Sequence, residues 1–176
     1  MKPEELLDLL VSWDNLALVT KEIVARQEYF PVLMEIALYS RHPKSWRAAW
    51  VVDKIHATRP ELVTPYLEQM IQQLRKENFP GKKRQFLKLI SLHDIRQKHH
   101  SFLLDYCLEC FLSAHEPVSV RVYALQVLYN ISEVQTLFKP ELLSIIEHEL
   151  ELQPVAGVHS RGKKLAKLLS RQVNRL

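Results

Sequence analysis

The sequence is poor in glycine, which accounts for only three of its 176 residues. Sheet proteins with many tight turns need more, because glycine readily adopts the positive φ angles that such turns require. Loops that cradle phosphate groups are nearly excluded for the same reason, since they are built from closely spaced glycines. The many Leu, Glu, Gln and Lys residues favour helices instead, and the composition therefore predicts an all-α protein.

Cysteine is equally scarce. The two cysteines, Cys107 and Cys110, lie three positions apart within a predicted helix and do not make a disulfide framework. A zinc ion would need four ligands, and no second pair of Cys or His residues stands at a suitable spacing. We therefore expect both cysteines to fill core or half-buried positions, with no metal and no other cofactor bound.

Long apolar runs are missing as well. No stretch approaches the roughly 18 apolar residues that a membrane-spanning helix needs. The amino terminus, Met1-Lys2-Pro3-Glu4-Glu5, becomes acidic too early for a secretion signal. These features favour a protein that has no membrane partner and works in the reducing environment of the cytoplasm.

Acidic residues are absent from one end of the chain. No Asp or Glu follows Glu151, whereas six Lys and Arg residues do. The part up to Glu151 thus has 18 Lys and Arg against 20 Asp and Glu, or a net charge of −2, although the whole chain has +4. The basic character therefore describes one end of the molecule and not its whole surface.

What the sequence does contain is a repeat of about 38–40 residues. The apolar positions of residues 45–57 follow the i, i+3, i+4, i+7 spacing of one helix face, and they recur three times at intervals of 38. The four sets are Ala48, Val51, Val52 and Ile55; Phe86, Leu89, Ile90 and His93; Ala124, Val127, Leu128 and Ile131; and Gly162, Leu165, Ala166 and Leu169. Only His93 and Gly162 break the apolar pattern, so we expect these sets to form the core faces of successive helices.

A second series of helices repeats at a spacing of 40 residues. The segment Pro60-Glu61-Leu62-Val63 recurs almost literally as Pro140-Glu141-Leu142-Leu143. Proline suits the first turn of a helix, and an acidic residue there complements the helix dipole. Both segments therefore predict helix starts. In this series Cys110 takes the same core position as Met70 and Leu150.

The two series together predict a single domain of helix pairs. Its parts are an irregular amino-terminal unit (1–41), helix pairs at 42–78, 79–115 and 116–153, and a terminal capping helix at 158–176. The amino-terminal unit is expected to contain helices at about 3–11, 15–25 and 28–40. Asp14 is expected to be the N-cap of the second of these helices.

The pattern resembles a HEAT repeat, in which paired antiparallel helices stack into a superhelix. The resemblance covers about residues 42–172, and it rests on the apolar spacing together with the Pro-Glu-Leu start of the second helices. It implies an α–α superhelix of the HEAT or armadillo type, and such folds are mostly binding scaffolds. The expected function is that of a non-enzymatic scaffold that binds a protein partner, whose identity the sequence does not reveal.

The register also separates exposed positions from core positions. Trp50 occupies a place that is polar in the other repeats, so we expect this tryptophan to be at least partly exposed. The candidate binding residues of this first-helix face are Arg47, Trp50, Lys88, Tyr123, Arg161 and Lys164, with Gln85 in the same rows and Lys82, Lys83 and Arg84 at one helix entrance. Such a face could bind nucleic acid through phosphate neutralisation and base stacking, or its basic side chains could simply solvate an outer surface.

The second helices have the opposite character, and the last helix is basic. The second-helix face is expected to be mildly acidic through Glu61, Glu109, Glu141 and Glu149. The last helix carries Lys164, Lys167 and Arg171 at helical spacing beside an apolar stripe. This helix could contact RNA or an acidic partner, or it could form the polar cap that ends a repeat array.

One enzyme class shares part of this pattern. The segment Trp46-Arg47-x-x-Trp50-x-x-Asp53 is similar in composition to the surface with which alkylpurine DNA glycosylases built from HEAT-like repeats hold a damaged nucleotide. That resemblance implies that Trp46 and Trp50 hold the lesion sugar. It further implies that Asp53 stabilises the oxocarbenium-like transition state and that Arg47 holds phosphate. In the repeat register, however, Asp53 falls in a row that is expected to be exposed and polar, so enzymatic activity is left open.

Overall fold

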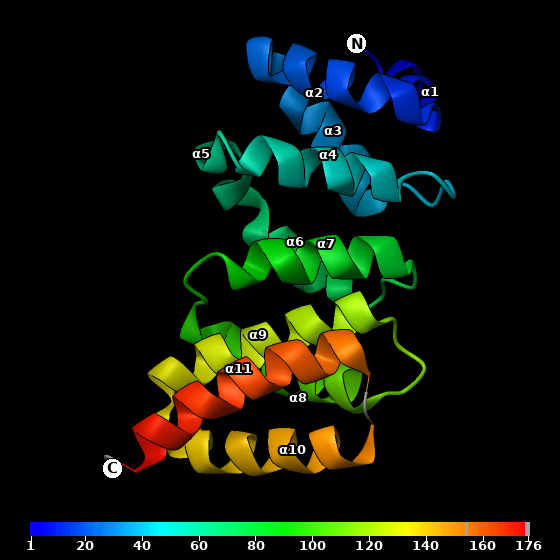
Figure 1. Cartoon of the computed structure of the whole chain (residues 1–176). Helices are drawn as coiled ribbons and strands as arrows, with labels where there is room; N and C mark the ends of the chain where they lie inside the picture. Colours follow the sequence, from blue (N-terminus) through cyan, green and yellow to red (C-terminus); the bar gives the residue numbers. More distant parts are fainter. Residues whose placement is uncertain (154, 175–176) are drawn as a thin grey trace. The chain divides into compact units, whose positions relative to one another are not determined.

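The computed structural model describes residues 1–153 and 155–174, and within these residues the chain is helical and contains no β-strand (Figure 1). The all-α prediction is therefore confirmed. The chain divides into two compact units, Met1–His93 (unit 1) and Asp94–Leu176 (unit 2), which are described one at a time. That the whole chain forms a single domain stays a prediction from the repeat register.

Unit 1 is built from short helices. They are α1 (Pro3–Val11), α2 (Leu16–Ala25), α3 (Phe30–Tyr39), α4 (Trp46–His56), α5 (Pro60–Val63), α6 (Leu67–Leu74) and α7 (Pro80–Ser91). α4 packs against α1, α2, α3 and α7, while α6 packs against α7 and α3. Apolar side chains such as Leu33, Val52 and Phe86 are buried in this unit. The helix α4 is therefore the central element to which most of unit 1 is attached.

Unit 2 is built from longer helices. They are α8 (His100–Leu112), α9 (Val118–Val134), α10 (Lys139–Leu152) and α11 (Ala156–Val173). α9 packs against α8, α10 and α11, and α10 packs against α11. The helix predicted at 158–176 is present as α11 and begins two residues earlier than expected, while residues 175 and 176 of its predicted range lie outside the described residues. Its role as a cap stays a prediction.

The repeat register predicted the core positions well. The apolar residues of the four sets are buried, apart from the half-buried Ala166. Gly162, which breaks the apolar pattern, is buried as well because α11 lies close to α10 there. A Cβ at this position would lie 2.8 Å from Cδ2 of Leu150. A side chain at this position would therefore require the end of the Leu150 side chain to shift, so the glycine helps α11 lie close to α10.

Single turns of 3₁₀-helix precede several of the α-helices. They are η1 (Trp13–Asn15) before α2, η2 (Gln27–Tyr29) before α3, η3 (Thr64–Tyr66) before α6, η4 (Gln97–His99) before α8 and η5 (Thr136–Phe138) before α10. The prediction that Asp14 is an N-cap is wrong, because Asp14 lies inside η1 and α2 starts only at Leu16. The predicted start at Pro60 is confirmed, but α5 ends after one turn, where Pro65 enters η3.

Candidate functional site

Three tryptophans of unit 1 form a cluster at the start of α4. Trp46 and Trp50 stand four positions apart, so they lie on one face of this helix. Trp13, from η1, packs against both, with ring centroids 5.9 Å from Trp46 and 5.4 Å from Trp50. Trp13 is 51% exposed, whereas the other two rings are half-buried. We call Trp13, Trp46 and Trp50 the tryptophan patch.

The neighbouring helix α7 packs against Trp46 of this patch. Gly81, at the start of α7, lies against Trp46, and a Cβ at Gly81 would be 3.0 Å from Cβ of Trp46. The prediction that Trp50 is at least partly exposed agrees with its half-buried position. The repeat register did not single out Trp13, because this residue lies in the irregular amino-terminal part, where no repeat spacing identifies it.

Two cations lie over the faces of these rings. Nζ of Lys54 is 4.9 Å from the ring centroid of Trp50, and the guanidinium of Arg47 is 5.4 Å from that of Trp13 and 5.7 Å from that of Trp46. These distances lie within the range of cation–π attraction. The tryptophan patch is therefore a half-exposed aromatic surface with a positive rim.

Arg47 has a second role that its place in an exposed row did not suggest. Its Nη1 donates to the carbonyl oxygens of Leu10 and Val11 at the end of α1, the first over 3.1 Å. The last carbonyls of a helix have no partner within the helix and carry partial negative charge, so a cation there is stabilising. Arg47 thereby fixes the end of α1, and with it the adjoining turn that carries Trp13, against α4.

Two other basic residues near the start of a helix do the same. Nζ of Lys82 on α7 donates to the carbonyl of Ser40 at the end of α3 over 2.6 Å. Nε of Arg121 on α9 donates to the carbonyl of Phe111 near the end of α8 over 2.9 Å. The expectation that Lys82 belongs to an exposed basic entrance is wrong, since this residue is 1% exposed. Some of the basic residues of the first helices therefore bind carbonyls within the protein and are not available to a partner.

Asp53 and Lys88 form an ion pair between α4 and α7. Nζ of Lys88 lies 2.8 Å from each of the two carboxylate oxygens of Asp53. Asp53 is only 6% exposed, so its assignment to an exposed polar row is wrong. A carboxylate in the interior needs a cation close by, and the neighbouring helix supplies one. Both oxygens of the residue that a glycosylase-like reaction would need are therefore already engaged by Lys88.

Gln85, also expected in the exposed rows, is buried too, at 2% exposed. It lies on α7, which packs against both α4 and α6. Because α7 has a neighbouring helix on two sides, more of its residues are buried than the single apolar face predicted from the sequence, and Gln85 is one of them.

A histidine pair lies one helical turn beyond Asp53. Nε2 of His56 and Nε2 of His93 are 2.8 Å apart, and the two rings meet edge to face with centroids 4.9 Å apart. His93 lies in the turn after α7 and not on the helix face where the repeat spacing placed it, because α7 ends at Ser91. Burial lowers the pKa of His56, the positive charge of a protonated His93 lowers it further, and the carboxylate of Asp53 partly opposes both effects. These effects together favour the neutral form of the His56 ring.

This histidine contact predicts acid sensitivity. The folded-state pKa of His56 lies below its ordinary value of 6.5, so the unfolded chain takes up the proton more readily. The free energy of unfolding should therefore fall as the pH decreases from about 6.5 through the folded-state pKa of His56. Urea unfolding at about pH 7.5 and about pH 5 measures this loss. Between these two pH values, the free energy of unfolding should fall clearly less in the variant His56→Gln than in the wild type. An equal fall in both proteins would show that His56 does not cause the acid sensitivity.

A family model for the HEAT repeat domain matches residues 4–168. The chain belongs to the HEAT repeat family. The match includes the tryptophan patch and the helices that carry it. No curated protein and no solved structure gives a significant match to the chain. The HEAT repeat protein is thus a helical-repeat scaffold of a kind that generally mediates protein interactions.

Unit 2 of the HEAT repeat protein holds the remaining candidate residues. Tyr123 on α9 is half-buried, and Arg161 on α11 donates to the side-chain carbonyl of Gln126 on α9. Of the candidates in this unit, Lys164, Lys167 and Arg171 are exposed, and their side chains have no ion-pair or hydrogen-bond partner among the described residues. The structure thus collects Trp46, Arg47 and Trp50 in unit 1, while the exposed candidate cations of unit 2, Lys164, Lys167 and Arg171, all lie on α11.

The acidic second-helix face is smaller than predicted. Glu149 on α10 is 3% exposed, and its Oε1 accepts a hydrogen bond of 2.7 Å from Nη2 of Arg121. The expectation that Glu149 is exposed is therefore wrong, because its carboxylate pairs with the buried Arg121 in the interior. Glu61, Glu109 and Glu141 are exposed as predicted.

The two cysteines of the HEAT repeat protein occupy core positions, as predicted. Both Cys107 and Cys110 are buried and unpaired, and burial raises the pKa of the Cys107 thiol well above its ordinary value. Within residues 1–153 and 155–174, no three or more His, Cys, Asp or Glu side chains gather as metal ligands would. None of the helices in this part of the chain combines the length and apolar character of a membrane span.

Proposed function

We propose that this HEAT repeat protein is a non-enzymatic scaffold that binds a partner protein through the tryptophan patch. The observation that carries the proposal is the 51% exposure of Trp13 beside the half-buried Trp46 and Trp50. Leaving aromatic surface in water is unfavourable, and exposed apolar patches bordered by polar groups mark interaction sites. Tryptophan is also among the residues that most often dominate binding energy. The proposal includes a cytoplasmic location, which two unpaired cysteines support.

The positive rim of the patch indicates the chemistry of the partner. Lys54 is exposed and lies over Trp50, while Arg47 borders Trp13 and Trp46. An apolar side chain can bury the tryptophan rings, and a carboxylate next to it can reach the exposed ammonium of Lys54. The preferred partner segment is therefore an apolar or aromatic residue flanked by Asp or Glu.

The prediction is that Trp13→Ala weakens binding of such a segment about 30-fold, as expected for the loss of a binding hot spot of about 2 kcal/mol. A library of displayed random peptides, selected on the whole protein, supplies the ligands, so the natural partner need not be identified first. Selected peptides should combine an apolar residue with neighbouring carboxylates. Their affinity for wild type and variant can then be measured by isothermal titration calorimetry.

Leu92→Ala is the matched control. Leu92 lies in the same unit and is 55% exposed, close to the exposure of Trp13, but it does not belong to the tryptophan patch. This variant should bind the selected peptides as the wild type does. The proposal fails if the peptides bind Trp13→Ala with unchanged affinity, provided that circular dichroism shows the variant to be folded.

A second candidate function is nucleic-acid binding through α11. The observation that favours it is the group of exposed and unpartnered cations Lys164, Lys167 and Arg171, among the residues that the structure describes. Phosphate contacts make affinity fall steeply with salt. Fluorescence anisotropy with labelled single- and double-stranded DNA and RNA should then show binding at low salt that weakens strongly at physiological salt. Changing all three residues to Gln should abolish it, and no binding at low salt would exclude this function.

A further inference from the structure

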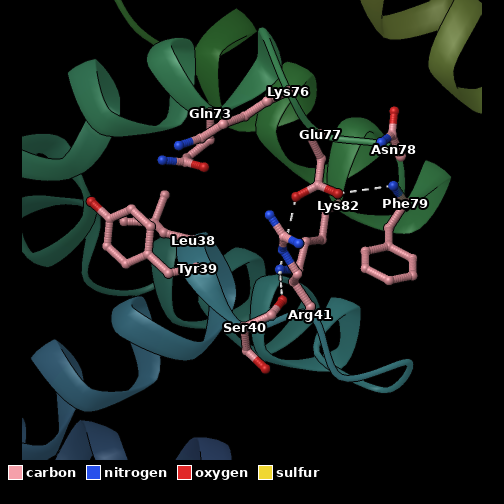
Figure 2. A pocket seen from close by; sticks show the side chains of 10 residues that line it. All are labelled: Leu38, Tyr39, Ser40, Arg41, Gln73, Lys76, Glu77, Asn78, Phe79 and Lys82. Carbon is pink, nitrogen blue, oxygen red and sulfur yellow. Dashed lines mark hydrogen bonds and ion pairs between the residues drawn. The ribbon is translucent and has the colours of Figure 1, made fainter.

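Unit 1 contains a pocket away from the rings of the tryptophan patch, at the ends of α3 and α6 (Figure 2). Its volume is about 480 Å³, within the range of pockets that hold small ligands. One side comes from the end of α3 and the residue that follows the C-cap, with Tyr39 and Arg41. The other comes from α6 and the loop into α7, with Gln73, Lys76 and Phe79.

The back of the pocket is a fixed, internally neutralised group of polar atoms. Nζ of Lys82 donates to the carbonyl of Ser40 over 2.6 Å and lies 3.8 Å from Oε2 of Glu77. Oε1 of Glu77 accepts a hydrogen bond of 2.8 Å from the backbone N–H of Phe79. The side chains of Lys82 and Glu77 are 1% and 9% exposed. This pair ties the loop before α7 to the end of α3 and gives the pocket a defined shape.

Two further cations of the pocket are not neutralised. Arg41 and Lys76 are exposed, and neither side chain has an ion pair or hydrogen bond with the described residues. Figure 2 shows Lys76 beside Gln73 on one side of the pocket and Arg41 in front of Lys82 on another. Because Lys82 and Glu77 compensate each other, the pocket presents two positive charges that no residue of the described chain balances.

We propose that this pocket binds a phosphate monoester whose organic part is a flat apolar group. A phosphate monoester carries close to two negative charges near neutral pH, which matches the two uncompensated cations. The guanidinium of Arg41 can donate two parallel hydrogen bonds to phosphate oxygens, while Lys76 contributes a point charge. The rings of Tyr39 and Phe79 line the same pocket and offer contacts for the apolar part. A carboxylate with one charge would leave one of the cations unbalanced.

Isothermal titration calorimetry of the full chain with phenyl phosphate tests this inference. Phenyl phosphate should bind, inorganic phosphate should bind more weakly because it lacks the ring, and benzoate should bind at least about tenfold more weakly because it carries one charge. A phosphotyrosine peptide distinguishes the source of the ester. Tighter binding of the peptide than of phenyl phosphate assigns the site to a phosphorylated protein, and equal or weaker binding assigns it to a free ester.

The variants Arg41→Gln and Lys76→Gln should each weaken phenyl phosphate binding about tenfold or more. Both residues are exposed, so the variants should remain folded, which thermal unfolding checks. Lys44→Gln is the matched control, because Lys44 is an exposed cation in the same loop as Arg41 but does not line the pocket. Absence of phenyl phosphate binding, binding of benzoate with equal affinity, or full affinity of Arg41→Gln would each overturn the inference. None of these outcomes depends on the tryptophan patch.

Discussion

Replacing Arg121 by methionine is expected to lower the free energy of unfolding by about 3–5 kcal/mol, the usual cost of removing one partner from a buried ion pair. Arg121 is 2% exposed, and its guanidinium makes three contacts within unit 2. Nη2 donates to Glu149 over 2.7 Å, Nη1 to the side chain of Gln153 over 3.0 Å, and Nε to the carbonyl of Phe111. Methionine fills a similar volume but leaves the carboxylate of Glu149 buried without a counter-charge.

Urea unfolding followed by circular dichroism measures this loss, and a second variant identifies its cause. In Arg121→Met/Glu149→Leu both charges are removed, and most of the stability should return, because apolar residues can replace a buried pair at little cost. The double variant still lacks the hydrogen bond from Nε of Arg121 to the carbonyl of Phe111, so about 1 kcal/mol of the loss should remain. Arg171→Met, at an exposed position of α11, should change the stability little. If Arg121→Met were as stable as Arg171→Met, the buried network would have no structural role.

Lys88→Met is expected to lower the free energy of unfolding by about 2 kcal/mol. The physical reason is again a carboxylate left without its cation, here Asp53, whose side chain is 7% exposed. The expected loss is smaller than for Arg121, because the side chain of Lys88 is 28% exposed and water already weakens the pair.

The repeat register supplies the matched control for this variant. Lys164 holds the same register position on α11 as Lys88 on α7, but it is exposed and unpartnered among the described residues. Lys164→Met should therefore leave urea unfolding almost unchanged. Asp53→Asn/Lys88→Met should recover part of the loss, since it removes the buried charge. Equal stability of Lys88→Met and Lys164→Met would show that the Asp53 pair contributes nothing.

These two results bear on function as well as on stability. The repeat register places Lys88, Arg47 and Lys164 on one basic face, but in the structure their surroundings differ. Lys88 balances Asp53, Arg47 holds the end of α1, and Lys164 has no partner within the described chain. Only cations of the last kind are free to bind a partner without a loss of stability. Variants that test nucleic-acid binding therefore belong on α11 and not on α4 or α7.

The fold was predictable because its signal is local and repeated. Apolar residues three and four positions apart identify a helix face, and the recurrence of that face every 38 residues identifies the repeat. The apolar residues of the first series are buried except for the half-buried Ala166, and Cys110 is buried where the register placed it, whereas Leu150 of the second series is half-buried. Short elements were less predictable. Asp14 has the side chain of a helix N-cap, yet the chain makes a 3₁₀ turn there first.

The sequence by itself determined the all-α class, the repeat, the core faces and the partial exposure of Trp50, since these depend on spacing within single helices. Only the tertiary structure decided which polar residues are free. Lys88 and Asp53 are separated by 35 positions, Arg47 and Leu10 by 37, and Arg121 and Glu149 by 28. A buried charge needs a partner at hydrogen-bonding distance, and helix packing, not sequence spacing, brings such distant residues together. The same packing places Trp13 on Trp46 and Trp50 and so creates the tryptophan patch.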